Sequence, residues 1–357
     1  MRLAIPCPVL VPLVLHASVG LAQQERLDSL WSPGASHTTA SLRGLAVTPG
    51  IVWASGQRGT FLRSTDAGAT WITDSVPGAA AFDFRGVAAL DARTALLMVA
   101  AQDTARIYRT TDAGRTWAVV YDDRRPGAFL DAIAVWDRRR AIALGDPMDG
   151  VFVVLLSDDD GAHWTRAPPT ALPRALPGEG AFAASNSCLI TGPGGTAWFA
   201  SGGGAVARVF HTTDFGRSWS VVDTPLPAGD GASGIFSLAF RDSLHGVAVG
   251  GDYQASDSVR ANVALTSDGG RHWTLADPAR ATRFLSGVAY TGSSPDAPVV
   301  AVGTRGTWVS LDGGLIWSWT GSSPYNAVVA TGGTAVAVGP HGAVATWSAF
   351  DYLRRSH

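Results

Sequence analysis

Lysine is absent from this chain of 357 residues, and glutamate is nearly so. All 27 basic residues are arginine, and the 29 acidic residues include only two glutamates, Glu25 and Glu179. Without lysine, the protein can form neither a Schiff base nor a phosphate-binding loop centred on a lysine ammonium group. The formal net charge of −2 argues against nucleic acid or an anionic membrane surface as the main partner.

Cysteine and the familiar catalytic motifs are also scarce. Cys7 and Cys188 are the two cysteines, and the sequence contains no HExxH, GxSxG, phosphate-loop, CxxC or complete dinucleotide-binding pattern. The eight histidines are scattered, with no pair at the spacing of metal ligands. We therefore expect no metal site and no cofactor. Cys188 lies in an apolar stretch, which predicts a buried and unreactive thiol.

The N-terminal residues are typical of an export signal. Arg2 precedes the apolar run Val9–Leu15, and Gly20–Ala22 offers small residues for cleavage. The apolar run is too short to cross a membrane. We therefore expect residues 1–22 to be a signal peptide and residues 23–357 to form a single exported domain, periplasmic or secreted. Removal of the signal also removes Cys7, so no intramolecular disulfide is available.

One eight-residue pattern, [ST]-x-D-x-G-x-x-W, occurs six times, and we call it the octet. The copies are Ser64–Trp71, Thr110–Trp117, Ser157–Trp164, Thr212–Trp219, Thr266–Trp273 and Ser310–Trp317. Their spacing of 44 to 55 residues is that of propeller blades. The Asp can accept hydrogen bonds from the backbone of a turn, the Gly permits a positive φ, and the Trp begins the next strand. We expect a structural role for the six aspartates: Asp66, Asp112, Asp159, Asp214, Asp268 and Asp312.

Short β runs surround the octets, two before each and one after, so that the repeating unit has four strands. The first strands are expected at residues 42–47, 84–90, 130–136, 183–190, 235–240, 285–290 and 325–330. The seventh unit has a third strand at Ala343–Phe350 but little chain left for a fourth. Arg26–Trp31 can supply that strand, which would close the ring and remove two open sheet edges. The sequence thus predicts an all-β, seven-bladed β-propeller of four-stranded antiparallel blades, closed by its N-terminal strand.

The strand order predicts two different faces. The octets join third and fourth strands, so they emerge on one face, the octet face. Turns between second and third strands, and the links between blades, emerge on the other, which we call the mouth face. The long insertions at residues 165–182, 225–234 and 250–262 all belong to the mouth face. Irregular loops on a rigid scaffold usually carry function, so we expect recognition there.

Polar side chains are expected to gather at the mouth of the central channel. The candidate ligand-binding residues are Arg58, Arg85, Asp131, Asn186, Arg208, Arg305 and His341, and the candidate catalytic residues are Glu179, Asp146, Asp252 and Tyr253. Such a set could bind an anionic ligand or a sugar. Glu179 paired with Asp146 or Asp252 could act as the acid and base of a glycosidase. The alternative is that each Asp satisfies its own turn and each Arg pairs with a neighbouring carboxylate.

The octets resemble the Asp-box (BNR) repeat of sialidases, sortilin-type receptors and the plant photosystem II stability/assembly factor. The segments FLDAIAVWD, ALGDPMDG, LPGEGAFAASNSC, GIFSLAFRD and GVAVGGDY are similar to those of exported bacterial proteins grouped with that factor. The resemblance covers residues 43–347. It implies a seven-bladed, non-catalytic, exported propeller that holds protein partners during assembly.

Two hypotheses for function remain open. The first is a monomeric binding or assembly scaffold whose partner is a protein, with a carbohydrate or a small anionic ligand as alternatives. The second is a glycoside hydrolase similar to sialidases, with its site on the mouth face. A sialidase needs three arginines, a Tyr/Glu pair and an acidic Asp, and those residue types are present as Arg58, Arg208, Arg305, Tyr253, Glu179 and Asp146. A Glu179 carboxylate at an open mouth, roughly 5 to 9.5 Å from that of an Asp, would favour the enzyme. A Glu179 that caps a loop would favour the scaffold.

Overall fold

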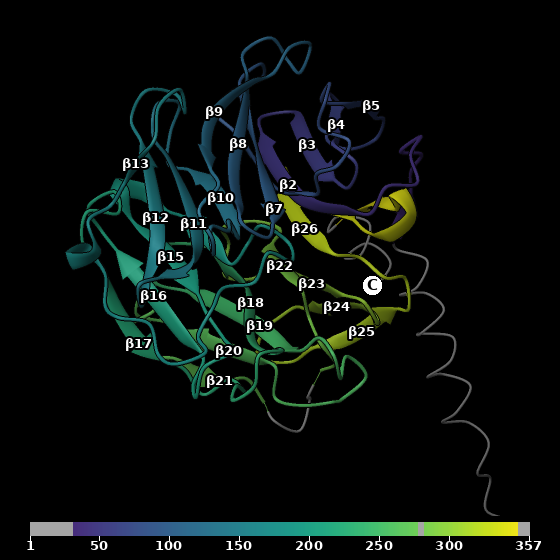
Figure 1. Cartoon of the computed structure of the whole chain (residues 1–357). Helices are drawn as coiled ribbons and strands as arrows, with labels where there is room; N and C mark the ends of the chain where they lie inside the picture. The colour runs from purple at the N-terminus through teal and green to yellow at the C-terminus, as the bar shows by residue number, and fades with distance from the viewer. Residues whose placement is uncertain (1–30, 278–281, 349–357) are drawn as a thin grey trace, which may run out of the picture.

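Seven four-stranded antiparallel sheets surround a common axis in the computed structural model, which describes residues 31–277 and 282–348 (Figure 1). The predicted seven-bladed propeller is confirmed. The first, or inner, strand of each blade lies beside the inner strands of both neighbouring blades, so the inner strands form a closed ring. In Figure 1 the colour follows the ring from purple blade 1 to the yellow inner strand of blade 7, which lies beside blade 1.

The blades follow one another in chain order. Blade 1 consists of β2 (Leu42–Thr48), β3 (Ile51–Gly56), β4 (Thr60–Ser64) and β5 (Ile72–Ser75). Blade 2 consists of β6 (Phe84–Ala89), β7 (Ala95–Ala101), β8 (Thr104–Thr110) and β9 (Ala118–Asp123). Blade 3 consists of β10 (Ala132–Val135), β11 (Ala141–Met148), β12 (Val151–Ser157) and β13 (Thr165–Arg166). Blade 4 consists of β14 (Leu189–Thr191), β15 (Ala197–Ala200), β16 (Arg208–Thr212) and β17 (Ser220–Asp223). Blade 5 consists of β18 (Ser233–Phe240), β19 (Gly246–Asp252), β20 (Val263–Thr266) and β21 (Thr274–Leu275). Blade 6 consists of β22 (Gly287–Tyr290), β23 (Val299–Gly303), β24 (Gly306–Ser310) and β25 (Ser318–Gly321). Blade 7 contains β26 (Ala327–Thr331), β27 (Thr334–Val338), β28 (Val344–Ser348) and β1 (Trp31–Pro33).

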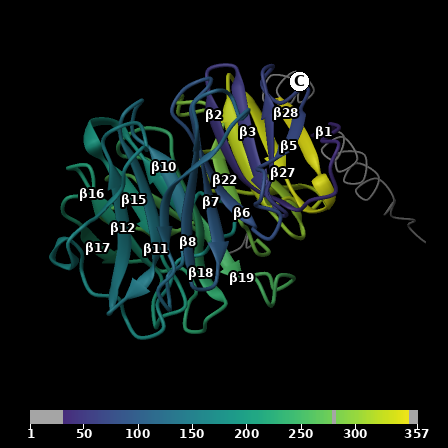
Figure 2. The ribbon, with the colours of Figure 1, turned by 45° about the horizontal axis from the view of Figure 1, so that its top comes forward.

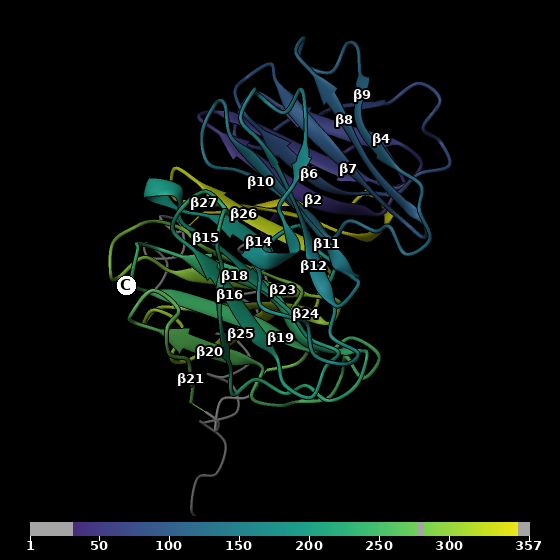
Figure 3. The same ribbon diagram turned by 60° about the vertical axis from the view of Figure 1, so that its left-hand side comes forward.

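In the described part of the chain, the connections contain three short 3₁₀ turns: η1 (Pro169–Ala171), η2 (Pro193–Gly195) and η4 (Pro340–Gly342). Among residues 31–277 and 282–348, no helix has the length and apolarity needed to cross a bilayer. Figure 3 shows the four strands of blade 5, β18 to β21, following one another from the middle of the molecule toward its lower edge.

The hydrophobic core lies between neighbouring blades. Because each sheet is covered on both faces, its second strand is a nearly continuous apolar run, as in β7 (ALLMVAA), which is almost wholly buried. Outer strands such as β5 (ITDS) are mostly exposed. Between blades 3 and 4, Phe199 stacks on Phe210 with ring centroids 4.3 Å apart, and Phe152 meets both rings edge-on. Cys188 is completely buried in this layer, as the sequence predicts, and burial raises the pKa of its thiol.

The N-terminal strand closes the ring. β1 pairs antiparallel with β28, with Trp31 opposite Trp347, and Figure 2 shows the two strands side by side. The closure predicted from the sequence is confirmed, but the strand continues to Pro33 rather than ending at Trp31. The first part of the predicted strand, residues 26–30, lies outside the described residues, as do the predicted signal peptide, residues 1–22, and residues 349–350 of the predicted third strand.

One inner strand differs from its prediction. Residues 183–188 do not join blade 4 as strand, and β14 begins only at Leu189. Asn186 has a φ of 68°, in the left-handed region. Its side chain accepts a hydrogen bond from Ile133 N at 2.9 Å and donates to the carbonyls of Val87 and Ile133 at 2.9 and 3.0 Å. The segment therefore ties blade 4 to blades 2 and 3 and leaves the ladder of its own blade.

Candidate functional site

The six octets share one hydrogen-bond pattern. The hydroxyl of the first residue donates to Oδ1 of the Asp and accepts from the N–H of the glycine, as in Ser64 Oγ to Asp66 Oδ1 at 2.7 Å and Gly68 N to Ser64 Oγ at 2.8 Å. In the first five octets the seventh side chain also donates to Oδ2 of the Asp, at 2.6 or 2.7 Å. Hydrogen bonds from Thr70 lower the pKa of Asp66 to about 2. The octet carboxylates are therefore engaged within their own turns.

The octet also packs against the preceding blade. Its fourth and fifth residues both have positive φ, for example 56° at Ala67 and 92° at Gly68. The fifth residue faces a neighbouring core: a Cβ on Gly114 would lie 2.7 Å from Cε2 of Phe61. Only glycine combines this backbone with so close a contact. The repeated octet is thus a tight turn that fits one blade to the next.

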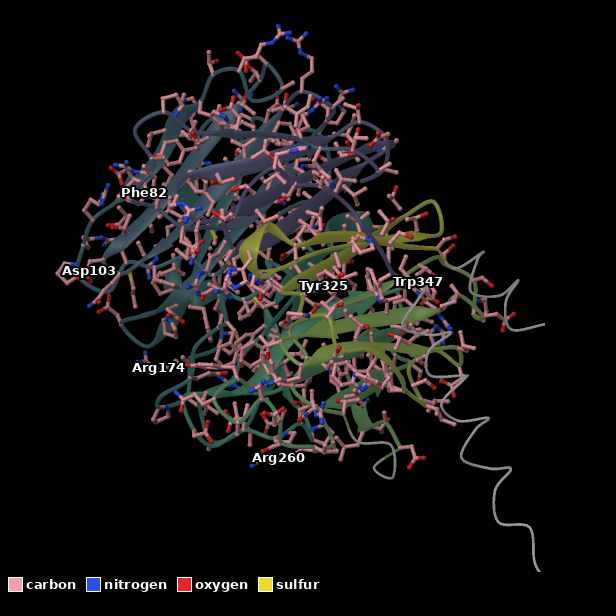
Figure 4. The ribbon with its side chains drawn as sticks, turned by 90° about the vertical axis from the view of Figure 1, so that its right-hand side faces the viewer. Phe82, Asp103, Arg174, Arg260, Tyr325 and Trp347 are labelled. Carbon is pink, nitrogen blue, oxygen red and sulfur yellow. The ribbon has the colours of Figure 1, made fainter. Side chains whose placement is uncertain are left out.

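The mouth face has a different construction. Three inner strands contain a β-bulge at an equivalent position, and the bulged residues are Arg43 in β2, Arg85 in β6 and Phe236 in β18. A bulged residue leaves the ladder, and bulges commonly redirect a side chain next to a functional site. In Figure 4, Phe82, Asp103, Arg174 and Arg260, from links and turns of this face, lie along the left and lower edge of the view.

One side of the mouth is charged. Arg85 pairs with Asp83 (Nε to Oδ2, 3.0 Å) and donates from Nη1 to the carbonyl of Ala183 at 3.2 Å. Arg43 lies near this pair, and its buried Nε has no hydrogen-bond partner among the described residues. Burial lowers the pKa of Arg43, and the neighbouring charge of Arg85 lowers it further. The charge of Asp83 opposes both effects, so Arg43 is a partly buried cation that shares this carboxylate with Arg85.

A buried carboxyl group, Asp131, lies close to Arg85, with the partly buried carboxyl group of Asp146 near it. Asp131 is completely buried, and neither of its oxygens has a hydrogen-bond partner in the described part of the chain. Burial raises its pKa well above the usual value, and the nearby charge of Asp146 acts in the same direction, opposed by Arg85. Burial also raises the pKa of Asp146, whose Oδ1 accepts from Ala181 N at 3.1 Å. Burial thus favours the protonated form of Asp131, which can donate a hydrogen bond as well as accept one. We call Arg43, Arg85, Asp131 and Asp146 the charged side.

The other side of the mouth is aromatic. Phe182 stacks on Phe236 with ring centroids 3.8 Å apart, Phe284 meets Phe236 edge-on at 4.8 Å, and Tyr253 does so at 6.1 Å. Tyr253 is half exposed, whereas Phe236 and Phe284 are buried. We call these four residues the aromatic side. Arg85 reaches it through the carbonyl of Ala183, the residue after Phe182.

Glu179 does not belong to either side, because it holds a loop in place. Its Oε1 accepts from Ser201 Oγ at 2.6 Å and Arg208 Nε at 2.9 Å. Its Oε2 accepts from Leu176 N at 2.7 Å and from Nη2 of Arg208. The two side chains of this ion pair are almost wholly inaccessible to solvent. With both oxygens bonded twice, Glu179 caps the loop that links blades 3 and 4.

The remaining candidates are spread around the rim. Arg58 donates to Thr39 Oγ1 at 3.2 Å in blade 1, and Arg305 pairs with Asp257 at 2.9 Å between blades 5 and 6. Asp252 accepts the backbone N–H groups of Gln254 and Ala255, and His341 has a φ of 55° within η4. The structure therefore brings together Asp131, Asp146 and Arg85, and separately Glu179 and Arg208. The three arginines of the sialidase hypothesis each bond locally in a different blade.

Arg43, Asp83 and the Phe182–Phe236–Phe284 stack are missing from the sequence-based set. A signal for some of them was present: when the inner strands LRGLAV, FRGVAA, LDAIAV and IFSLAF are aligned, the second column contains Arg43, Arg85, Asp131 and Phe236. In the described residues, no group of three or more His, Cys, Asp or Glu side chains is arranged to hold a metal ion.

Comparison with solved structures identifies similar folds at low sequence identity. A YCF48 structure bound to D1 peptide superposes with a TM-score of 0.65 and 16% identity over 89% of this chain and 97% of that one. YCF48 from Cyanidioschyzon merolae superposes with a TM-score of 0.63 and 14% identity, over 89% of this chain and 99% of that one. The GH74 xyloglucanase from Xanthomonas campestris has a TM-score of 0.58 and 18% identity, and 53% of that chain is covered. The Niastella koreensis GH74 enzyme has a TM-score of 0.53 and 14% identity, and 43% of that chain is covered. No family model and no curated protein matches the sequence. These similarities show a shared propeller fold.

Proposed function

We propose that this protein is an exported, non-catalytic scaffold that binds a protein segment at the mouth of its channel. In this proposal, Arg43 and Arg85 bind a carboxylate of the partner, and the aromatic side receives an apolar side chain next to it. The observation that carries the proposal is Arg43, a partly buried guanidinium beside Arg85, whose Nε has no hydrogen-bond partner among the described residues. A buried cation is unfavourable without a counter-ion, and guanidinium groups bind carboxylates especially well.

A protein segment fits this mouth better than a free anion does. The charged and aromatic sides are contiguous through Arg85 and Ala183, so a ligand with both a carboxylate and an apolar group could contact both. Peptides present that combination on adjacent residues. The YCF48 structure of similar fold is bound to D1 peptide, which supports peptide binding as a use of this architecture.

Capture by the immobilised chain of residues 23–357 tests the proposal. Exported proteins of the source organism are applied, and bound segments are mapped by cross-linking and mass spectrometry. We expect the Arg43→Gln/Arg85→Gln variant to lose at least 10-fold in capture, and amidation of the partner's carboxylates to do the same. The control Arg93→Gln/Arg115→Gln removes two exposed arginines of the octet face and should capture normally. Equal capture by both variants would refute a role for the mouth arginines.

The export step is part of the proposal and has its own test. Expression of the full chain in its source, followed by fractionation and N-terminal sequencing, should recover the protein outside the cytoplasm with Gln23 as its first residue. A protein that retains Met1 in the cytoplasmic fraction would contradict it.

A glycoside hydrolase is the second candidate function. The favouring observations are the paired carboxyl groups Asp131 and Asp146 at the mouth and the fold shared with GH74 enzymes. The test is a panel of xyloglucan, sialosides and chromogenic glycosides. An enzyme would hydrolyse at least one of them and lose that activity in Asp131→Asn and Asp146→Asn. Loss of turnover in Glu179→Gln, with folding intact, would instead point to the loop at Glu179. The scaffold proposal expects no turnover.

A further inference from the structure

The sixth octet, SLDGGLIW, breaks the polar pattern of the other five. Its second, sixth and seventh residues are Leu311, Leu315 and Ile316, with 45%, 52% and 44% of their surface exposed. The equivalent residues of the other five octets are polar or small. They are Thr65, Thr111, Asp158, Thr213 and Ser267 at the second position, Ala69, Arg115, Ala162, Arg217 and Arg271 at the sixth, and Thr70, Thr116, His163, Ser218 and His272 at the seventh. A stable turn therefore does not require these aliphatic residues.

The same substitution frees a carboxylate oxygen. In the other octets the seventh side chain donates to Oδ2 of the Asp, but Ile316 has no donor in its side chain. Among the described residues, the hydrogen bonds to Asp312 both end on Oδ1, from Ser310 Oγ at 2.7 Å and Ile316 N at 2.9 Å. Oδ2 of Asp312 is thus available to a donor from outside the octet.

A cleft leads inward from this octet, between blades 5 and 6. It encloses about 340 Å³ and is lined by Leu315 and Asp312 at the rim, by Asp268 and His272 of the fifth octet, and by Arg241 and Tyr290 at its inner end. Tyr290 donates to the carbonyl of Gly313 at 3.2 Å, which ties the sixth octet to the inner strand of its own blade.

The inner end of the cleft meets an apolar cavity. Arg241 and Tyr290 also line a cavity of about 530 Å³ at the octet-face end of the channel. Its walls come from the last residues of the inner strands of blades 1, 4, 5, 6 and 7, with Val47, Leu238 and Val328 among them. Aliphatic surface at the channel and aliphatic surface at the rim are thus joined by a polar cleft.

We propose that this groove is a second binding surface, which takes an extended protein segment with a basic residue between two aliphatic ones. In an extended chain, side chains two residues apart point the same way, so a segment can place apolar groups at both ends and a polar one between. Arg241 is matched by Asp242 at 3.4 Å. Asp268 is bonded to His272 at 2.6 Å, so the carboxylate of Asp312, which has no cationic partner among the described residues, is the negative charge that a Lys or Arg side chain would complement.

A second copy of this chain is a poorer occupant. A stable dimer buries about 20–30 residues on each side. The exposed aliphatic residues here are three in the sixth octet, together with Leu244 in the adjoining turn of blade 5. A groove of this size suits one short segment. This surface lies on the face opposite Arg43 and Arg85, so it is independent of the function proposed above.

Panning of a phage-displayed library of random 12-residue peptides on the chain of residues 23–357 tests the proposal. The library is first depleted on a Leu311→Thr/Leu315→Arg/Ile316→Thr variant, in which these three residues of the sixth octet are replaced by those of the second octet. We expect enriched peptides with Lys or Arg between aliphatic residues, at least 10-fold weaker binding to the triple variant, and unchanged binding to Arg43→Gln/Arg85→Gln. A single Asp312→Asn variant, which keeps the turn bonds on Oδ1, should weaken the same peptides several-fold.

Weaker peptide binding by the triple variant must not come from unfolding. Thermal unfolding should show this variant to be at least as stable as the parent, because the threonine introduced at position 316 can donate to Asp312. No enriched peptide, enrichment of acidic peptides, or equal binding to parent and triple variant would overturn the proposal. Sedimentation that shows a dimeric parent and a monomeric triple variant would also overturn it, in favour of a second copy.

Discussion

Aspartate has opposite roles on the two faces of this ring. On the octet face, Asp66 and its counterparts accept hydrogen bonds within one turn, and the pKa of Asp66 falls to about 2. On the mouth face, Asp131 is completely buried, neither of its oxygens has a partner among the described residues, and its pKa rises well above the usual range. Hydrogen bonds thus favour the charged form of the side chain on one face, and burial favours the neutral form on the other. Carboxylates that repeat with the blades mainly hold turns, whereas Asp131, which departs from the repeat, has no partner among the described residues.

The largest expected effect concerns Glu179, a buried mouth-face carboxylate with both oxygens bonded. Arg208→Met should lower the free energy of unfolding by about 3–5 kcal/mol, because it leaves Glu179 charged and buried without its partner. Urea unfolding followed by tryptophan fluorescence measures the loss. The double variant Glu179→Gln/Arg208→Met should recover part of it. A loss below about 1 kcal/mol would mean that the pair does not hold the blade 3–4 link.

The next effect tests the octet side of the comparison. Asp214 accepts from Thr212 Oγ1, Arg217 N, Ser218 N and Ser218 Oγ, at 2.6 to 2.9 Å. Asp214→Ala should cost about 2 kcal/mol of stability, since these donors lose a charged acceptor. Asp296→Ala, on an exposed turn, is the matched control and should change stability by less than about 0.5 kcal/mol. Similar values for the two variants would contradict a structural role for the octet.

The pH dependence should distinguish the two kinds of aspartate. Asp131 has a raised folded-state pKa, so the native state holds a proton that the unfolded chain has released above about pH 4. Stability should therefore increase as the pH falls from 7 toward about 4, with a slope of up to about 1.4 kcal/mol per pH unit. Octet carboxylates have depressed values, so their contribution is complete above about pH 4 and is lost as the pH falls through about 2.

Asp131→Asn should remove the increase in stability between pH 7 and about 4 and keep the loss of stability as the pH falls through about 2. Urea midpoints between pH 2 and 8 provide the measurement, with Asp296→Asn as the control. A parent and an Asp131→Asn variant with parallel profiles above pH 4 would show that Asp131 is ionised in the native state, and the contrast between the faces would fail.

The smallest expected effect concerns the octet that departs from its own face. Ile316→Thr should raise stability by about 0.5–1 kcal/mol, because the new hydroxyl can donate to Oδ2 of Asp312 as Thr70 does to Asp66. Thermal unfolding of the single variant measures the gain, and Thr70→Ile is the reciprocal control that should lose a similar amount. A loss of stability in Ile316→Thr would mean that the aliphatic side chain is part of the core.

The sequence was most informative where the chain repeats. The octets, the number of blades and the closing strand could all be predicted, because each blade has the same local turn chemistry and the same alternation of short apolar strands. The strand predicted at residues 183–190 was wrong in its first part, because Asn186 bonds to residues 53 and 99 positions away. No local pattern reports such partners.

The candidate site was predictable in its residue types and less so in its grouping. Asp131, Asp146 and Arg85 were selected from the sequence and do lie together. Glu179 was selected because it is the one glutamate in the propeller, yet its ion pair with Arg208 occupies both oxygens. Arg43 was missed, since its importance rests on the absence of a partner, and a sequence does not show which side chains remain unpaired.

By itself, the sequence determined the ring: six copies of one turn, seven inner strands and a spare N-terminal strand admit little else, because short-range hydrogen bonds and strand periodicity act on neighbouring residues. Only the tertiary structure decided which charges are satisfied. Asp66 and Asp131 are the same type of residue, but hydrogen bonds within its octet lower the pKa of Asp66, whereas burial among the blades raises that of Asp131. The physical reason is that desolvation and pairing depend on atoms brought together from distant blades, and these are set only when the ring closes.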